Sequence, residues 1–153
     1  MPELLGLPGD EFVYREGEST FKMHLLCKTN DRFWFSNGFS FGLDIILEKT
    51  GKHADDFLLS RDLWTHLRDY LAIADWSGLM PGDGVIIFDE NCRIATPDVI
   101  AVKDSDRKMF VTAGGFILSF NERRIIPSGY SVEVKDIKMS DEAAHFLHQM
   151  YDY

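Results

Sequence analysis

The feature that most constrains the fold is the repeated alternation of short apolar runs with turn-forming residues in the second half of the chain. Clusters of Asp, Asn, Gly, Pro and Ser separate these runs, as at Gly114-Gly115 and at residues 127–129. Short strands with turn chemistry between them are typical of a strongly bent sheet or a small β-barrel. The five candidate strands cover residues 85–88, 99–102, 109–111, 116–118 and 130–134.

The first half is also β-like, after an irregular arm that we expect over residues 1–10. Apolar and aromatic runs at 12–14, 20–25 and 32–35 predict an antiparallel meander. Within it, Asn37-Gly38 favours a two-residue hairpin turn of type I′, because both central residues of that turn have positive φ.

The segment 39–50 is compatible with two structures. Its apolar residues alternate as in a strand, but Ser40 could cap a helix that ends before Gly51. We expect a strand over 39–41 and a short helix from about Leu43.

Two segments have the pattern of amphipathic helices. The central one, from about Arg61 to Asp75, follows the N-cap candidate Ser60 and carries one apolar face. That face consists of Leu63, Leu67, Tyr70, Leu71 and Ala74. The closing helix follows Ser140, with acidic residues in its first turn, where the helix dipole favours negative charge.

Together these patterns predict a single α+β domain over residues 1–153. It consists of an N-terminal antiparallel meander, a central amphipathic helix, a C-terminal bent sheet or small β-barrel, and a closing helix.

The charge of the chain points to a class of partner. There are 25 Asp and Glu against 16 Lys and Arg, on a chain that is 45% hydrophobic and can therefore build a core. Such a surface repels nucleic acid and anionic membranes and attracts basic proteins. The acids are densest at residues 1–20 and 129–153, so termini that lie close together would form one negative patch.

We therefore predict a basic protein partner, with no nucleic acid, no membrane and no cofactor. The aromatic strand at 32–35 adds a candidate contact, because Phe33 and Phe35 share one face while Trp34 takes the other. The candidate partner-binding residues are Glu11, Glu16, Glu18, Trp34, Asp136, Asp141 and Glu142.

The sequence offers only weak evidence for a metal or catalytic site. Glu142, His145 and His148 follow one another at three-residue steps on the closing helix, but a carboxylate-bridged metal centre needs ligands from other helices. A solvated helix face is the favoured explanation. Cys27 and Cys92 lack metal-site spacing and are expected to be buried free thiols.

One short motif carries a resemblance. The run Ser77-Gly78-Leu79-Met80-Pro81-Gly82-Asp83, followed by strands and Lys103, resembles the Ser/Lys barrel peptidases over these few residues. The expected Ser–Met spacing is missing, and an ordinary turn before a strand is the favoured explanation of the run.

Three functions stay open. The first is a non-catalytic acidic binding module that acts on a basic protein, as an antidote or immunity protein or a phage-encoded inhibitor does. The second is a small hydrolase-like enzyme that uses His and carboxylate residues, and the third is a viral or phage structural or assembly component. The N-terminal residues have no secretory pattern, so we expect a cytoplasmic protein, and the oligomeric state is left open.

Overall fold

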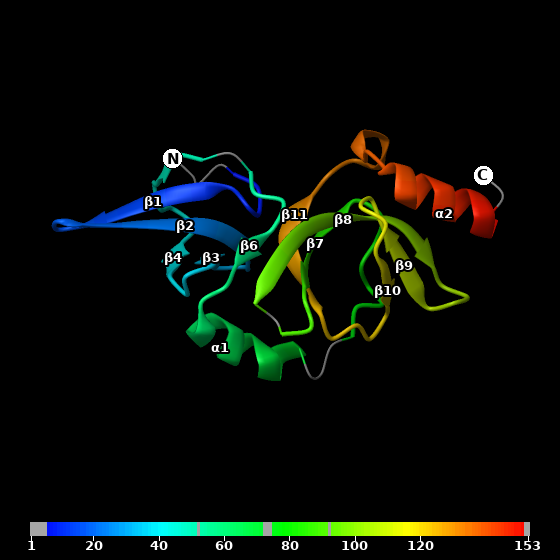
Figure 1. The fold of residues 1–153 in the computed structure, drawn as a ribbon, viewed down its shortest axis with the longest axis horizontal. Coiled ribbons are helices and arrows are strands. Elements are labelled where there is room, and N and C mark those ends of the chain that lie inside the picture. The colour runs from blue at the N-terminus through cyan, green and yellow to red at the C-terminus, as the bar shows by residue number, and fades with distance from the viewer. Residues whose placement is uncertain (1–5, 52, 72–74, 92, 152–153) are drawn as a thin grey trace.

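The computed structural model describes residues 6–51, 53–71, 75–91 and 93–151, without the side chains of residues 68–71. Two antiparallel sheets, a central helix and a C-terminal helix form a mostly-β α+β fold (Figure 1), which confirms the predicted class. None of the helices in the described ranges is long and apolar enough to cross a membrane.

The first sheet is the predicted meander with one added strand. Its spatial order is β4-β3-β2-β1-β5, and all its pairs are antiparallel. Its strands are β1 (Glu11–Glu16), β2 (Ser19–Lys28), β3 (Arg32–Phe35), β4 (Ser40–Gly42) and β5 (Glu48–Lys49). Residues 6–10, before β1, are tied to it by hydrogen bonds from the Gly9 amide to the Leu25 carbonyl (2.7 Å) and from the Leu25 amide to the Asp10 carbonyl (2.9 Å).

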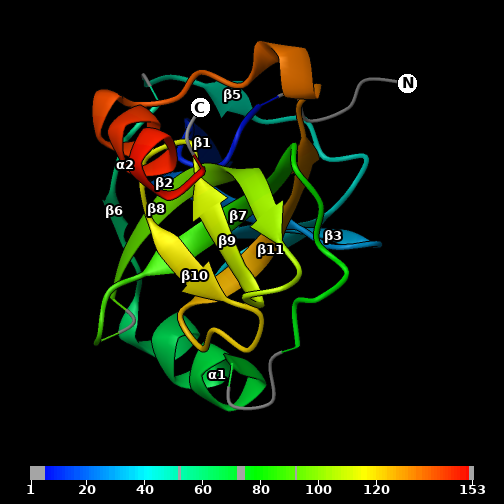
Figure 2. The ribbon, with the colours of Figure 1, turned by 90° about the vertical axis from the view of Figure 1, so that its right-hand side faces the viewer.

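The second sheet is bent and open. Its order is β10-β9-β8-β7-β11, with β6 paired to β8, and within the described residues its end strands β10 and β11 do not pair to close a barrel. Figure 2 shows it from the end that carries α2. Its strands are β6 (Phe57–Leu58), β7 (Asp83–Phe88), β8 (Ile94–Asp104), β9 (Met109–Thr112), β10 (Ile117–Ser119) and β11 (Ile125–Ser131).

Both helices begin where the sequence predicted. Helix α1 (Arg61–Leu71) is capped by Ser60, whose Oγ accepts a hydrogen bond from the Leu63 amide at 3.2 Å. Helix α2 (Asp141–Tyr151) is capped in the same way by Ser140 and the Ala143 amide at 3.1 Å, and it follows the 3₁₀ turn η1 (Val134–Asp136). The predicted end of α1 at Asp75 is wrong, since Asp75 is not helical; Ala74 lies outside the described residues.

The helix expected from about Leu43 is wrong. The chain turns at Leu43 and Asp44 and then runs extended into β5. Leu43, Ile45 and Leu47 all pack against the core of the first sheet while Asp44, Ile46 and Glu48 are exposed, so the burial has a period of two.

Two further local predictions need correction. A hairpin does join β3 to β4, but only Gly38 has positive φ; the Asn37 side chain instead accepts the Phe39 amide at 3.0 Å, so the turn is not of type I′. The turn expected at residues 127–129 is part of β11, where a register irregularity follows Pro127. Pro127 is tolerated because β11 ends the sheet order, where a missing amide breaks no second ladder.

The core has three parts. One buried cluster belongs to the first sheet and contains Phe12 and Phe35; another belongs to the second sheet and contains Ile100 and Phe110. The third joins both sheets and α1. It comprises Leu26, Cys27, Phe57, Leu59, Leu63, Ile86, Phe88, Ala95 and Ile126.

Strand β2 reaches two of these cores because its alternation is broken. Leu25, Leu26 and Cys27 are buried in succession, and the pairing of β2 with β3 shifts register between Leu25 and Cys27. A bulge of this kind turns following side chains to the other face. Leu25 therefore packs in the first sheet, whereas Leu26 and Cys27 pack between the sheets.

The sheets meet at Gly129 of β11. This residue has φ of 80°, and a Cβ there would fall onto the carbonyl oxygen of Lys28, at the end of β2. Glycine is required both by the backbone conformation and by the close approach.

Replacement of this glycine tests the junction. We expect Gly129→Ala to lower the free energy of unfolding by about 3 kcal/mol or more, because backbone strain and a backbone clash add. Gly17→Ala is the matched control: its φ is also positive, at 59°, but no atom lies within 4 Å of the added Cβ, so about 1 kcal/mol is expected. Urea unfolding measures both, and equal losses would contradict this account of the junction.

Candidate functional site

A groove of about 490 Å³ lies where the two sheets meet beside α1. Its floor is apolar and comes from β2, α1 and β11, whereas its rim is polar and comes mainly from the loop after β2. The lining residues are Leu26, Cys27, Lys28, Thr29, Asn30, Trp34, Leu63, His66, Leu67, Ile126, Pro127 and Gly129. Concave apolar sites with a few polar groups are the usual form of a ligand site.

An aromatic pair forms one wall of the groove. Trp34 stacks on His66 of α1 with ring centroids 6.4 Å apart and planes inclined by 21°. The Trp34 indole N–H donates to the Thr29 hydroxyl at 3.2 Å, which fixes the ring. Phe33 and Phe35 are buried on the opposite face of β3, as strand parity predicts.

The floor contains a thiol that is poorly suited to catalysis. Cys27 is free, and its exposed fraction is 5%. Burial raises the pKa of the Cys27 thiol to about 12, so the nucleophilic thiolate is scarce at neutral pH. Cys92 lies outside the described residues.

The candidate partner-binding acids form separate groups. Glu16 and Glu18 are exposed at the tip of the β1–β2 hairpin, whereas Asp141 and Glu142 are exposed in the first turn of α2 and Asp136 in η1. Figure 1 shows the hairpin tip and α2 at opposite ends of the long axis, so these acids do not form the single negative patch that termini lying close together would have made.

The other two candidates lie elsewhere. Glu11 is half-buried in β1, where its Oε1 accepts the Thr50 hydroxyl at 2.9 Å. Trp34 belongs to the groove and not to either acidic group. The groove itself was missed by sequence reasoning, although the broken alternation at residues 25–27 marked the strand that forms its floor.

The described histidines do not converge. His24 stacks on Phe57, His53 lies 3.5 Å from Asp10, and His66 stacks on Trp34. Glu142, His145 and His148 are exposed on α2. In the part of the chain that the structure describes, no group of three or more His, Cys, Asp or Glu residues is arranged to hold a metal ion.

Ser77 and Lys103 lie close together, but not as a nucleophile and its base. The Lys103 ammonium donates to the Ser77 backbone carbonyl at 2.6 Å and lies 3.6 Å from the Met80 sulfur. It also lies 5.7 Å from the centre of the Phe120 ring. These contacts fasten the loop before β7 onto β8, which favours a structural role for Lys103.

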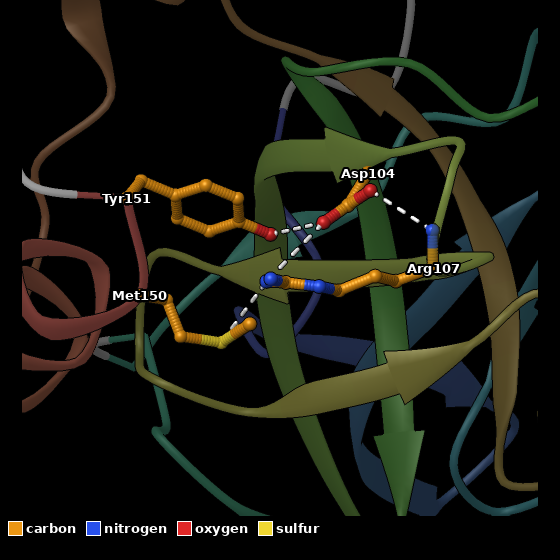
Figure 3. Close-up of polar contacts among 4 residues, drawn as sticks. All are labelled: Asp104, Arg107, Met150 and Tyr151. Carbon is orange, nitrogen blue, oxygen red and sulfur yellow. Dashed lines mark hydrogen bonds and ion pairs between the residues drawn. The ribbon is translucent and has the colours of Figure 1, made fainter.

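A second, polar hollow lies beside the end of α2, where Figure 3 shows a network of four residues. The Tyr151 hydroxyl donates to Asp104 Oδ2 at 2.5 Å, and the Arg107 amide donates to Asp104 Oδ1 at 3.0 Å. The Arg107 guanidinium lies 5.5 Å from the centre of the Tyr151 ring and contacts the Met150 sulfur at 3.8 Å. The network attaches α2 to the β8–β9 hairpin.

The same contacts shift two pKa values in opposite directions. The Tyr151 hydroxyl, with the Arg107 amide, holds the pKa of Asp104 below its ordinary value of 3.8. The hydrogen bond to Asp104 raises the pKa of Tyr151 above 10.0.

Comparison with known proteins adds no family. The sequence matches no protein-family model and no curated protein.

One prediction from the site concerns the thiol in the groove floor. Because burial hinders access and raises its pKa, Cys27 of the native protein should stay unmodified by iodoacetamide at pH 8, and should react after denaturation. Peptide mapping by mass spectrometry follows this residue separately. Labelling of native Cys27 at the rate of the denatured chain would contradict its placement.

Another prediction concerns the attachment of α2. The lowered pKa of Asp104 contributes stability above pH 3.8 that is lost as the pH falls through the lowered value; the raised pKa of Tyr151 contributes stability below pH 10.0 that is lost as the pH rises through the raised value. We expect Tyr151→Phe to lower the melting temperature between these limits, and the difference from the wild type to shrink beyond either limit.

The phenylalanine keeps the ring beside Arg107 and removes only the hydroxyl. Thermal unfolding of both proteins across the pH range measures the difference between their melting temperatures. The titration of all other acids affects both proteins equally and therefore cancels in this difference. A difference that does not change with pH would show that the Asp104–Tyr151 hydrogen bond does not attach α2.

Proposed function

We propose that this protein is a non-catalytic acidic binding module that acts on a basic protein partner, in the manner of an antidote or immunity protein or a phage-encoded inhibitor. The observation that carries the proposal is the acidic tip of the β1–β2 hairpin, which extends away from the rest of the molecule (Figure 1). Residues 15–20 are all exposed.

The charges at this tip are unbalanced. Glu16 and Glu18 make no ion pair with any described residue, and the neighbouring Arg15 is already paired with Glu48 at 3.1 Å. A protruding segment with uncompensated negative charge can enter a positively charged concave surface and can steer association over long range.

The chemistry of the grooves supports binding over catalysis. The thiol of the apolar groove is poorly ionised, and the described histidines lie apart from one another. Nucleophilic catalysis requires a base within hydrogen-bonding reach of the nucleophile, and no hydrogen bond joins the Cys27 thiol to a described histidine.

Charge neutralisation at the tip tests the proposal. A partner captured from cells that contain the protein is purified, and its affinity is measured at several salt concentrations. We expect the affinity to fall as salt rises, and the double variant Glu16→Gln/Glu18→Gln to bind about tenfold more weakly at low salt.

The opposite end of the molecule supplies the control. Asp136→Asn/Glu142→Gln removes the same number of charges from exposed positions, so it should leave the affinity within about twofold if the contact is local to the tip. Salt-independent binding, or equal losses from the two double variants, would refute the assignment to the hairpin. Assembly of the protein alone, seen by light scattering, would favour the structural-component alternative.

A further inference from the structure

We propose that the groove between the two sheets binds a small monocarboxylate with an apolar body, such as an alkyl or aryl carboxylate. This inference is independent of the proposed function, because it concerns a different face and a ligand of opposite charge.

The groove offers an apolar floor for the body of such a ligand. Leu26, Ile126 and Cys27 are buried at the junction of the sheets, and Leu63 and Leu67 face them from α1. A volume of about 490 Å³ lies in the range of small-molecule sites.

The rim offers donors for one negative charge. Lys28 makes no ion pair or side-chain hydrogen bond with any described residue, and the side chains of Asn30 and His66 have no hydrogen-bond partner among the described residues. An ammonium, an amide N–H and an imidazole N–H are all donors that a carboxylate accepts. The nearby carboxylate of Asp31 accepts the Thr29 hydroxyl at 3.3 Å and does not line the groove.

The balance of charge selects the head group. Lys28 is the only Lys or Arg among the lining residues in the described part of the chain, which matches a single negative charge better than a phosphate dianion.

The shape favours a small molecule over a peptide. A peptide that adds to a sheet needs a strand edge with free backbone amides. At the groove, the end strand β11 contains Pro127, which has no amide, and the Lys28 carbonyl lies close to Gly129. The groove is therefore a hollow between packed elements and not an extension of a sheet.

Three ligands with one alkyl chain and different head groups test the proposal. Octanoate, 1-octanol and octylamine are titrated by calorimetry. We expect octanoate to bind at least about tenfold more tightly than octanol, because a single charge-assisted hydrogen bond contributes an affinity ratio of about that size. Octylamine should bind least. Equal affinities for octanoate and octanol, or no binding of octanoate at millimolar concentration, would overturn the proposal.

Two variants locate the head group. Lys28→Gln should reduce octanoate affinity about tenfold and leave octanol affinity unchanged. Lys22→Gln, at an exposed position on the same strand, should change neither. Unchanged octanoate binding by Lys28→Gln, or an equal loss from Lys22→Gln, would exclude Lys28 as the partner of the carboxylate.

The position of the alkyl chain is tested separately. Leu67→Trp should fill the groove and weaken octanoate and octanol alike, with folding verified by circular dichroism. In the wild type, octanoate should shift the indole N–H resonance of Trp34, assigned with Trp34→Phe. No shift at saturation would overturn the placement of the ligand in the groove. If an apolar tetrapeptide with a free carboxyl terminus bound more tightly than octanoate, the ligand would be the end of a peptide and not a small molecule.

Discussion

The absence of a side chain at Gly129 lets the Lys28 carbonyl come close, and the shared core and the groove lie at this junction of the two sheets. On one side of it lies the meander β4-β3-β2-β1-β5, on the other the bent sheet β10-β9-β8-β7-β11. Each sheet has its own buried cluster, and the shared cluster with α1 closes the space between them. A larger residue at position 129 would separate strands whose side chains are packed at interior density, where small displacements are costly.

The fold divides the acidic residues of the chain into separate groups. Its ends carry negative charge at two distant points, the tip of a protruding hairpin and the start of α2. In α2 the acids have a local role, because they complement the positive end of the helix dipole. No comparable backbone feature accounts for the acids at the hairpin tip, which is why the proposed partner contact is assigned there.

The sequence predicted the architecture well, because periodicity and capping are local properties. Ser60 and Ser140 act as caps as expected, and the Gly114-Gly115 turn joins β9 to β10. Local patterns failed where tertiary packing decided between two options. The alternation of Leu43, Ile45 and Leu47 fits a strand, whereas Ser40 and Gly51 also allowed a short helix. The cluster around Phe12 selects the extended form.

The candidate site was less predictable than the fold. Its residues come from segments as far apart in the sequence as Lys28, His66 and Gly129, and no local sequence pattern predicts that these segments lie side by side. The one signal was the succession Leu25-Leu26-Cys27, which breaks the alternation of β2. The break turns this strand toward both cores, so an irregularity in the pattern was more informative about the groove than the regular strands around it.

The connectivity of the sheets has a kinetic consequence. Most strand pairs join neighbours in the sequence, as in β1–β2, β2–β3, β7–β8, β8–β9 and β9–β10, so they close short loops at little entropic cost. The contact between β2 and β11 closes a far longer loop, and its packing stabilises the fold only when both strands are in place. The hairpins should therefore assemble early and the junction late, so the groove between the sheets should be the last part of the surface to acquire its shape.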